Sequence, residues 1–382
     1  MTPGALEGVL VADFSRVLAG PYATMLLGDL GADVVKVERP GTGDDTRAWG
    51  PPWAGDQATY FLSVNRNKRS VTLNLRDAEE LALARELALR ADVLVENFKP
   101  GVFDRLGLGY DSLSSDNPGL VYTSITGFGT HGGEDLPGYD LLVQAVGGLM
   151  SMTGSRPDEP VKVGVALVDV ITGLHASVGI LAALQHRERT GLGQRVEVNL
   201  LSSLLSALVN QGSGFVAAGF VPGIMGNRHP SIAPYESYPT ADKPFVIAVG
   251  NDAQFRALVE VLGVAELADD PRFATNPARV QHRDELYALM CDCLAGECAD
   301  VWFERLSARG VPCGPINDVS GAFALAQRLG LGPVIDIEDV PTVANPIGLG
   351  VSAVTYRRRP PRLGENTHDL VSWLRADRAE PR

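Results

Sequence analysis

No run of apolar residues in this 382-residue sequence approaches the ~20 residues that a membrane-spanning helix requires. The apolar runs at 177–184 and 200–209 are shorter, and polar residues interrupt or bound them. The first residues, Met1 to Gly4, carry neither the basic region nor the apolar core of a signal peptide. We therefore expect a cytoplasmic protein that does not insert into a membrane.

An excess of basic residues is also missing. The 33 Lys and Arg residues are outnumbered by 46 Asp and Glu residues, which gives a formal net charge of −13 at pH 7. Because nucleic acids and anionic membranes attract positively charged surfaces, this balance argues against both as partners. We expect the partners to be small molecules.

Residues that bind metals or act as nucleophiles are scarce. There are only four cysteines and six histidines. Cys291, Cys293 and Cys298 lie close together, but no histidine near them completes a set of metal ligands. We therefore expect reduced thiols and no metal site. The sequence also contains no H-E-x-x-H zinc motif and no G-x-S-x-G nucleophile turn.

The glycine fingerprint G-x-G-x-x-G is absent from the first expected turn between a strand and a helix, so a dinucleotide site is not supported. Apolar runs nevertheless alternate with helical segments at 22–30 and 77–91. The runs expected to be strands are 9–14, 33–38, 70–75, 93–97 and 120–125. This alternation predicts an α/β domain with a mostly parallel, Rossmann-like sheet.

The rest of the chain predicts a second domain, as the length of the chain also favours. Helices are expected at 172–186, 199–209, 252–262, 279–295, 299–309 and 367–375, with a strand at 245–249. Residues 210–240 are rich in Gly, Pro, Ser and Asn, which is typical of a linker. We predict a large Rossmann-like domain over 1–209, this linker, and a smaller α+β domain over 241–315.

Asp169 stands where a strand-like apolar run meets the expected start of a helix. An Asp in such a place commonly accepts hydrogen bonds from the free amides of the first helical turn, as an N-cap. Small residues around it, including Gly164 and Gly173, also leave room for a ligand to approach. On spacing alone the cap is the more common role. The two roles are compatible, because a helix N-terminus stabilises negative charge.

Basic residues are spread over the first domain near the expected strand ends. Cations in such places are suited to the phosphates of a ligand, although most isolated Lys and Arg residues are solvated surface charges. The set consists of Lys36, Arg39, Arg47, Arg66, Lys68, Arg69 and Arg105.

Six short motifs follow one another along nearly the whole chain. They are V-A-D-F-S-R-V-L-A-G-P at 11–21, K-V-E-R-P at 36–40 followed by Gly43-Asp44, N-R-N-K-R-S at 65–70, E-N-F-K-P-G at 96–101, G-V-P-C-G-P at 310–315 and L-G-E-N-T at 363–367. Each motif alone is weak. Together and in this order they resemble the class III CoA-transferases, the family of formyl-CoA transferase and the α-methylacyl-CoA racemases.

The resemblance implies a fold, an assembly and an activity. A Rossmann-like large domain is joined through long linkers to the smaller domain, and residues 316–382 return to complete the large domain. Two chains interlock as a homodimer. The implied reaction transfers CoA from an acyl-CoA to a carboxylic acid, so acyl-CoA is a substrate and no cofactor is tightly bound.

The resemblance also implies roles for single residues. Asp169 falls at the position of the catalytic aspartate, which forms a mixed anhydride and then an aspartyl-CoA thioester. Tyr139 stands where the racemases have a histidine, and a phenol with an ordinary pKa of about 10 is a poor base at neutral pH. This favours transfer over racemisation. The residues implied to line the CoA groove are Val17, Leu18, Arg39, Lys68, Asn97, Phe98 and Arg105.

Alternatives stay open at this level. An acyl-CoA racemase or isomerase on the same fold is the nearest, and a CoA-binding protein without catalytic activity is the alternative from another class. An oxidoreductase is disfavoured by the missing glycine fingerprint. The donor and acceptor acids are not specified, because the glycine-rich loop that covers the site in formyl-CoA transferase is replaced here by the segments 226–230 and 233–236.

Overall fold

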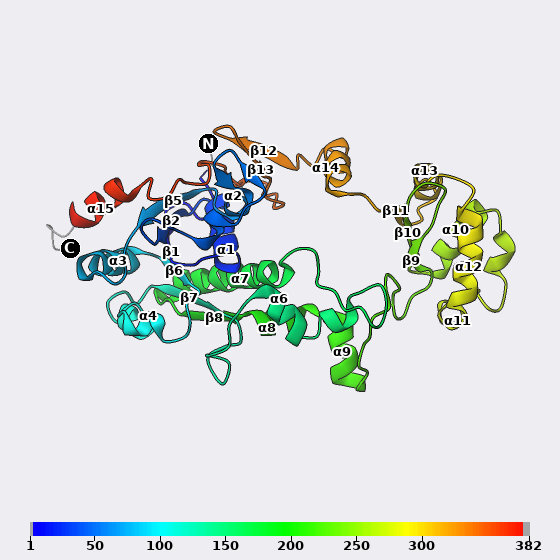
Figure 1. The fold of residues 1–382 in the computed structure, drawn as a ribbon, viewed down its shortest axis with the longest axis horizontal. Coiled ribbons are helices and arrows are strands. Elements are labelled where there is room, and N and C mark those ends of the chain that lie inside the picture. Colours follow the sequence, from blue (N-terminus) through cyan, green and yellow to red (C-terminus); the bar gives the residue numbers. More distant parts are fainter. Residues whose placement is uncertain (1–2, 377–382) are drawn as a thin grey trace. The chain divides into compact units, whose positions relative to one another are not determined.

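A computed structural model describes residues 3–376, which form two compact units (Figure 1). The first unit consists of the chain up to Leu149, of Lys162–Val221, and of the chain from Gly332 on. The second consists of Met150–Val161 and Pro222–Leu331.

The first unit is built on a six-stranded sheet in which every neighbouring pair is parallel. Its strands are β1 (Leu10–Asp13), β2 (Asp33–Glu38), β5 (Lys68–Thr72), β6 (Val93–Glu96), β7 (Val121–Thr126) and β8 (Arg195–Asn199). Their order in the sheet is β5-β2-β1-β6-β7-β8. This is the order of the doubly wound dinucleotide-binding fold, so the predicted Rossmann-like sheet is confirmed.

Both faces of the sheet are buried, which explains why its strands are nearly continuous apolar runs. Val11 and Val95 belong to a core shared with helices α1, α7 and α8, whereas Ala12 and Leu94 belong to a second core shared with α3 and α15 (Figure 1). The helices of this unit are α1 (Ala19–Asp29), α2 (Thr59–Val64), α3 (Ala78–Arg90), α4 (Val102–Arg105), α5 (Tyr110–Ser114), α6 (Asp140–Val146), α7 (Leu167–Thr190), α8 (Leu200–Ala207), α9 (Val209–Ala218) and α15 (Thr367–Ala376).

The C-terminal segment of the first unit is fastened by buried polar groups. The Asp29 carboxylate, at the end of α1, accepts hydrogen bonds from the Arg66 guanidinium group and from Asn345 Nδ2. Asn67 donates to the Thr355 carbonyl, and Asn366 accepts from the backbone of β5. The motifs at 65–70 and 363–367 are therefore joined to each other in the folded chain.

The second unit contains a three-stranded antiparallel sheet covered by helices, an α+β arrangement. Its strands are β9 (Tyr235–Tyr238), β10 (Phe245–Ala248) and β11 (Cys313–Pro315), in the order β11-β10-β9. Its helices are α10 (Asp252–Val261), α11 (Asn276–Gln281), α12 (Arg283–Leu294), α13 (Ala299–Ser307) and α14 (Val319–Arg328). The core between them is apolar and includes Phe245, Phe255 and Trp302.

The limits of the two units differ from those expected from the sequence. Helix α9 occupies the beginning of the expected linker and belongs to the first unit. The segment after 315 stays with the second unit as far as Leu331, because Ile316 continues the pairing of β11 by donating to the Pro244 carbonyl. Residues 150–161 also belong to the second unit, where Gly154 packs beside Ile224.

Several short elements were not expected from the sequence. They are the β3–β4 hairpin (Trp53–Ala54 and Gln57–Ala58), helices α2, α6 and α14, and the hairpin of β12 (Val334–Ile337) and β13 (Val340–Val343). Helix α1 begins at Ala19 instead of residue 22, because Gly20 and Pro21 fit into a first helical turn. Strand β5 begins at Lys68, before the predicted start at residue 70. The prediction began later because Lys68 and Arg69 are polar.

Helix α7 is longer than expected. It has 24 residues and by length and composition alone it could span a membrane, which the interrupted apolar runs of the sequence did not indicate. In the structure its buried side packs on α1, α8 and the sheet and contributes Val168, Ala176 and Ile180 to the core.

Candidate active site

The order in which strands are added to the sheet reverses between the neighbouring strands β1 and β6. The loops that follow these two strands form a crevice. In doubly wound sheets, ligands bind in this crevice, at the carboxyl ends of the strands. The loop after β1 is held to the loop after β6 by Asn97. Its side chain accepts from the Arg16 amide at 2.9 Å and donates to the Arg16 carbonyl at 2.8 Å.

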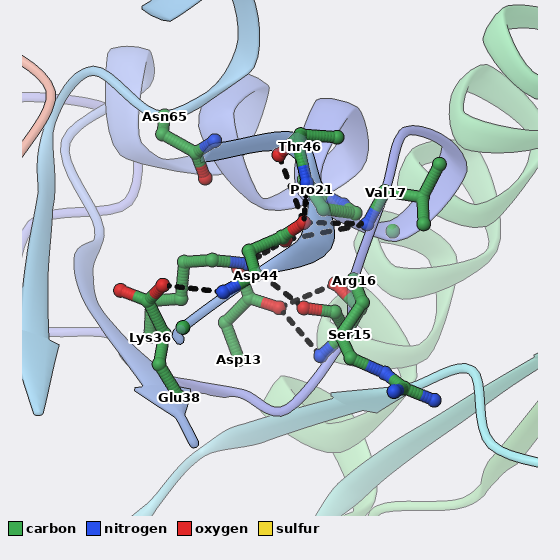
Figure 2. Close-up of polar contacts among 12 residues, drawn as sticks. Asp13, Ser15, Arg16, Val17, Pro21, Lys36, Glu38, Asp44, Thr46 and Asn65 are labelled. Carbon is green, nitrogen blue, oxygen red and sulfur yellow. Dashed lines mark hydrogen bonds and ion pairs between the residues drawn. The ribbon is translucent and has the colours of Figure 1, made fainter. Parts of the chain in front are cut away.

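Buried charges lie beneath the loop after β1 (Figure 2). Lys36 Nζ is 2.9 Å from Asp44 Oδ2 and donates to the Ser15 carbonyl at 2.9 Å, and both charged side chains of the pair are inaccessible to solvent. Burial alone would raise the pKa of Asp44, but Lys36 and hydrogen bonds from Thr46 lower it to about 2. A buried charge is tolerated only when it is paired and hydrogen-bonded in this way.

Lys68, expected to line the CoA groove, belongs to this buried cluster instead. It is 1% exposed, and its ammonium group contacts Asp13 Oδ2 at 3.0 Å, the Pro21 carbonyl at 2.9 Å and Asn65 Oδ1 at 3.0 Å. These three acceptors use all three of its N–H donors. Lys68 lines neither of the two cavities described below, so its contact with a ligand stays a prediction.

Val17 has a strained backbone. Its φ of 68° lies in the left-handed region, which a β-branched residue rarely adopts. The Asp44 carboxylate accepts a hydrogen bond from the Val17 amide, with both oxygens 3.3 Å from the nitrogen (Figure 2). The buried pair of Lys36 and Asp44 thus holds the loop in a conformation that it would not adopt alone.

Asp169 is half-buried in the first turn of α7 and is not its N-cap, because the helix begins at Leu167. The capping carboxylate comes from α6: Asp140 Oδ1 accepts from the Val168 amide at 2.8 Å and from the Asp169 amide at 3.2 Å. Burial, and then the negative charge of Asp140, raise the pKa of Asp169 to about 7. The reading of Asp169 as a cap is therefore wrong, and its side chain is left to face the crevice.

Close backbone contacts set the position of this helix end. A Cβ on Gly173 would lie 2.6 Å from the Ala19 carbonyl oxygen, so α7 can cross α1 this closely only with glycine there. One turn earlier, Ala166 and Val170 pack with Val17, Leu18 and the Tyr60 ring. Asp169 is thereby brought beside the loop after β1.

Two tyrosines lie near Asp169. Tyr139 immediately precedes α6 and is 63% exposed. Tyr60, on α2, was not identified from the sequence. Burial, and then the carboxylates of Asp169 and Asp140, raise the pKa of Tyr60 to about 12, so its hydroxyl group stays protonated at neutral pH.

Two adjacent cavities open along this crevice. The first, of about 270 Å³, is lined by Asp169 together with Val17, Leu18, Asn97, Phe98 and Tyr139. The second, of about 690 Å³, is lined by Arg39, Arg76 and Phe98, among others. Arg16 and Phe98 line both cavities and therefore stand at their junction.

The structure thus brings most of the expected site residues together. Arg105 is exposed and lines neither cavity, although Val102 and Leu106 on the same short helical segment line the second. Arg16, Asp140 and Tyr60 were missed. Arg16 and Asp140 stand next to residues that were singled out, but only the fold reveals that Arg16 lines both cavities and that Asp140 caps the start of α7.

Metal ligands are not clustered in the part of the chain that the structure describes. Among residues 3–376 there is no group of three or more His, Cys, Asp or Glu side chains that could hold a metal ion. The four cysteines are half-buried free thiols, and burial raises the pKa of Cys313 to about 11.

The chain is similar in sequence and in structure to known proteins. Residues 6–367 match the sequence model of a family described as CoA-transferase family III. The chain is 43% identical to the succinyl-CoA:glutarate CoA-transferase of Mus musculus, over 97% of this chain and 87% of that protein. It is 42% identical to the acetyl-CoA:oxalate CoA-transferase of Acetobacter aceti, over 99% of this chain and 97% of that protein. The crystal structure of a CAIB/BAIF family protein from Brucella suis superposes with a TM-score of 0.88 at 44% identity, covering 98% of this chain and 100% of that chain.

Proposed function

This chain belongs to family III of the CoA-transferases, enzymes that move CoA from an acyl-CoA to a carboxylic acid, and from this we propose that its acceptor is a short dicarboxylic acid. The relatives described above are named for glutarate and for oxalate, both dicarboxylic acids. Identity above 40% over nearly the whole chain supports the same class of acceptor. Because the exchange is reversible, the CoA thioester of a dicarboxylic acid then passes through the site in every turnover.

The proposed reaction begins with attack of the Asp169 carboxylate on the thioester carbonyl of the donor. The C–S bond breaks, CoA thiolate leaves, and a mixed anhydride of Asp169 and the donor acid forms. The thiolate then attacks the Asp169 carbonyl carbon, which releases the donor acid and leaves CoA on Asp169 as a thioester. The acceptor carboxylate attacks this thioester, which releases CoA thiolate and forms a mixed anhydride of Asp169 and the acceptor acid. The thiolate then attacks the acyl carbon of the acceptor, which gives the new acyl-CoA and releases the Asp169 carboxylate.

The observation that carries this proposal is the place of Asp169 in the same cavity as Val17, Leu18, Asn97 and Phe98. A carboxylate with a raised pKa beside a cavity is a frequent feature of catalytic sites. We propose that the adenosine and phosphate half of CoA occupies the larger cavity, near Arg39 and Arg76, whose charges suit phosphates. The pantetheine arm would then run past Phe98 toward Asp169, which holds the reacting groups together.

The test is a transfer assay with a panel of acids. Purified enzyme is incubated with succinyl-CoA and one free acid, and the new acyl-CoA is measured by mass spectrometry. We expect transfer to glutarate or oxalate and little transfer to butyrate or propionate. An enzyme that transfers CoA equally well to the monocarboxylic acids would contradict the proposed acceptor class.

We also propose that the enzyme is a homodimer, with interlocked chains as the resemblance implies. One face of α7 exposes Leu174 (44%), Val178 (66%) and Leu181 (37%), which follow one another at helical spacing. Exposed apolar stripes of this kind commonly mark a protein interface. Light scattering should give a dimer mass for the wild type. Val178→Asp places a charge in the stripe and should convert the dimer to a monomer; a monomeric wild type, or a Val178→Asp variant that stays dimeric, would contradict the proposal.

Two further points complete the proposal. Since the acyl-CoA and the free acid supply every reacting group besides Asp169, the reaction needs no resident cofactor. A cytoplasmic location suits the four free thiols, because reducing compartments keep cysteines unpaired.

A further inference from the structure

The guanidinium group of Arg16 has no carboxylate partner among residues 3–376. Its Nε atom is buried and has no hydrogen-bond partner, and within residues 3–376 its guanidinium group forms no ion pair. Two other arginines of this unit have carboxylate partners. Arg47 binds Glu38, and Arg66 binds Asp29. A buried donor without an acceptor costs free energy, so an unpaired guanidinium group at a cavity wall indicates a site for an anion.

The Arg16 side chain is nevertheless held in place. Asn97 fixes the Arg16 backbone through both its amide and its carbonyl group. The centre of the guanidinium group lies 4.6 Å from the centre of the Phe98 ring, a cation–π contact. Figure 2 shows the side chain extending away from the buried carboxylates of Asp13 and Asp44, with no contact drawn to its guanidinium group. An anion would meet a cation that is already oriented.

The surroundings indicate which anion this is. The larger cavity has its own cations for phosphates, Arg39 and Arg76. Among residues 3–376, the only other cation that lines the cavity containing Asp169 is Lys99, which is exposed. Arg16 is therefore the half-buried cation available to the acyl group of a substrate whose thioester lies at Asp169.

We propose that Arg16 binds the remote carboxylate of a dicarboxylyl-CoA and so selects dicarboxylic over monocarboxylic acids. This inference rests on the proposed function. A guanidinium group presents parallel N–H donors that match the two oxygens of a carboxylate, and a methyl group in the same place leaves those donors unpaired. Discrimination then comes from loss of a charged hydrogen bond, which is a stronger selector than the size of an apolar pocket.

The experiment compares succinyl-CoA with butyryl-CoA, which has a methyl group where succinyl-CoA has its remote carboxylate. In a two-stage exchange, kcat/KM for the donor reports only the steps up to release of the donor acid, so the choice of acceptor does not enter. We expect the wild type to prefer succinyl-CoA. In Arg16→Met, kcat/KM for succinyl-CoA should fall by roughly 10- to 100-fold, the value of one charged hydrogen-bonded pair, while that for butyryl-CoA should fall much less.

Matched variants separate the other source of an anion, the phosphates of CoA. Arg39→Met should lower kcat/KM for both donors equally and weaken binding of free CoA, whereas Arg16→Met should change the Kd of free CoA much less than Arg39→Met does. Two controls detect a folding defect. Arg16→Gln removes the charge but keeps a polar side chain, and a thermal unfolding curve compares the stability of each variant with that of the wild type. If Arg16→Met weakens CoA and affects both donors equally, or if it leaves the preference intact, the proposal is overturned. A wild type without any preference would instead refute the proposed substrate class.

Discussion

Asp169 shows how an environment changes an ordinary carboxylic acid. An exposed Asp is fully ionised at neutral pH, but burial and the neighbouring Asp140 raise the pKa of Asp169 to about 7. The protonated form cannot attack a thioester. A raised pKa also makes the ionised carboxylate a stronger base and hence a better nucleophile. A smaller fraction of Asp169 is then ionised at neutral pH, but each ionised carboxylate is more reactive in the proposed attack.

The pH dependence of the reaction follows from this. Because attack requires the ionised carboxylate, kcat/KM should be low at pH 5, rise through pH 7 and level off above pH 8. A profile that is flat between pH 5 and pH 8 would show that Asp169 does not titrate in this range.

Asp140→Asn offers a matched variant for this profile. The Asn side-chain oxygen can still accept hydrogen bonds from the backbone amides at the start of α7, but the side chain carries no negative charge. The midpoint should move to lower pH, although burial, the larger cause, keeps it above the ordinary value of an Asp. An unchanged midpoint would exclude Asp140 as a cause.

The buried pair of Lys36 and Asp44 allows a prediction about stability. Lys36→Met leaves the Asp44 carboxylate buried without its cation, which should cost about 3–5 kcal/mol of the free energy of unfolding. The matched control is Arg39→Met, which removes the exposed pair with Asp45 and should cost ~0–1 kcal/mol. Urea unfolding measures both, and equal losses would contradict the role of burial.

Glycines matter at the scale of the elements because they allow backbones to touch. A Cβ on Gly138 would lie 2.6 Å from the Gly127 Cα, at the point where the chain passes the end of β7 and enters α6. That crossing places Tyr139 at the cavity and Asp140 beside the first turn of α7. The start of α7, capped by Asp140, depends on it in turn.

Gly138→Ala should therefore displace α6 and impair catalysis. The added methyl group has no room beside the backbone, and such overpacking costs about 1–3 kcal/mol of stability. Activity should fall because the Asp140 cap moves away from Asp169. Gly164→Ala is the control, since a Cβ there meets nothing within 4 Å. Wild-type activity in the first variant, with kcat/KM as the readout, would refute this account of the crossing.

Strands could be predicted from the sequence wherever burial follows from the residues nearby. The apolar runs before Asp13 and Glu96 have two buried faces, so β1 and β6 were found almost to the residue. Elements that depend on tertiary contacts were not found. The first turn of α7 is an example, because its cap is a side chain 28 residues away. Lys68 is another: a lysine in a motif suggests a ligand, and only the fold reveals three internal acceptors.

At the scale of the whole molecule, the first unit is assembled from distant parts of the chain. Asp29, near the N-terminus, gathers Arg66 and Asn345 around one buried carboxylate. The sequence suggested a returning C-terminal segment only through resemblance, since nothing in its periodicity relates residue 345 to residue 29.

Asp29→Ala tests this fastening. It leaves the Arg66 guanidinium group buried without its carboxylate, so the free energy of unfolding of the first unit should fall by about 3–5 kcal/mol. Hydrogen exchange should rise over residues 345–358. Asp116→Ala, which breaks an exposed pair with Arg85 outside this segment, should have a much smaller effect. Unchanged exchange in the first variant would show that Asp29 does not hold this segment.

The central claim is that Asp169 carries CoA covalently during the reaction. The most direct measurement is mass spectrometry of the enzyme quenched in acid after mixing with succinyl-CoA in the absence of acceptor, followed by peptide mapping. Formation of a thioester between Asp169 and CoA should add the mass of CoA less one water to the peptide that contains Asp169. The adduct should disappear when glutarate is added and should be missing in Asp169→Asn. An enzyme that turns over with no adduct on Asp169, or an Asp169→Ala variant that transfers CoA at the wild-type rate, would contradict this account.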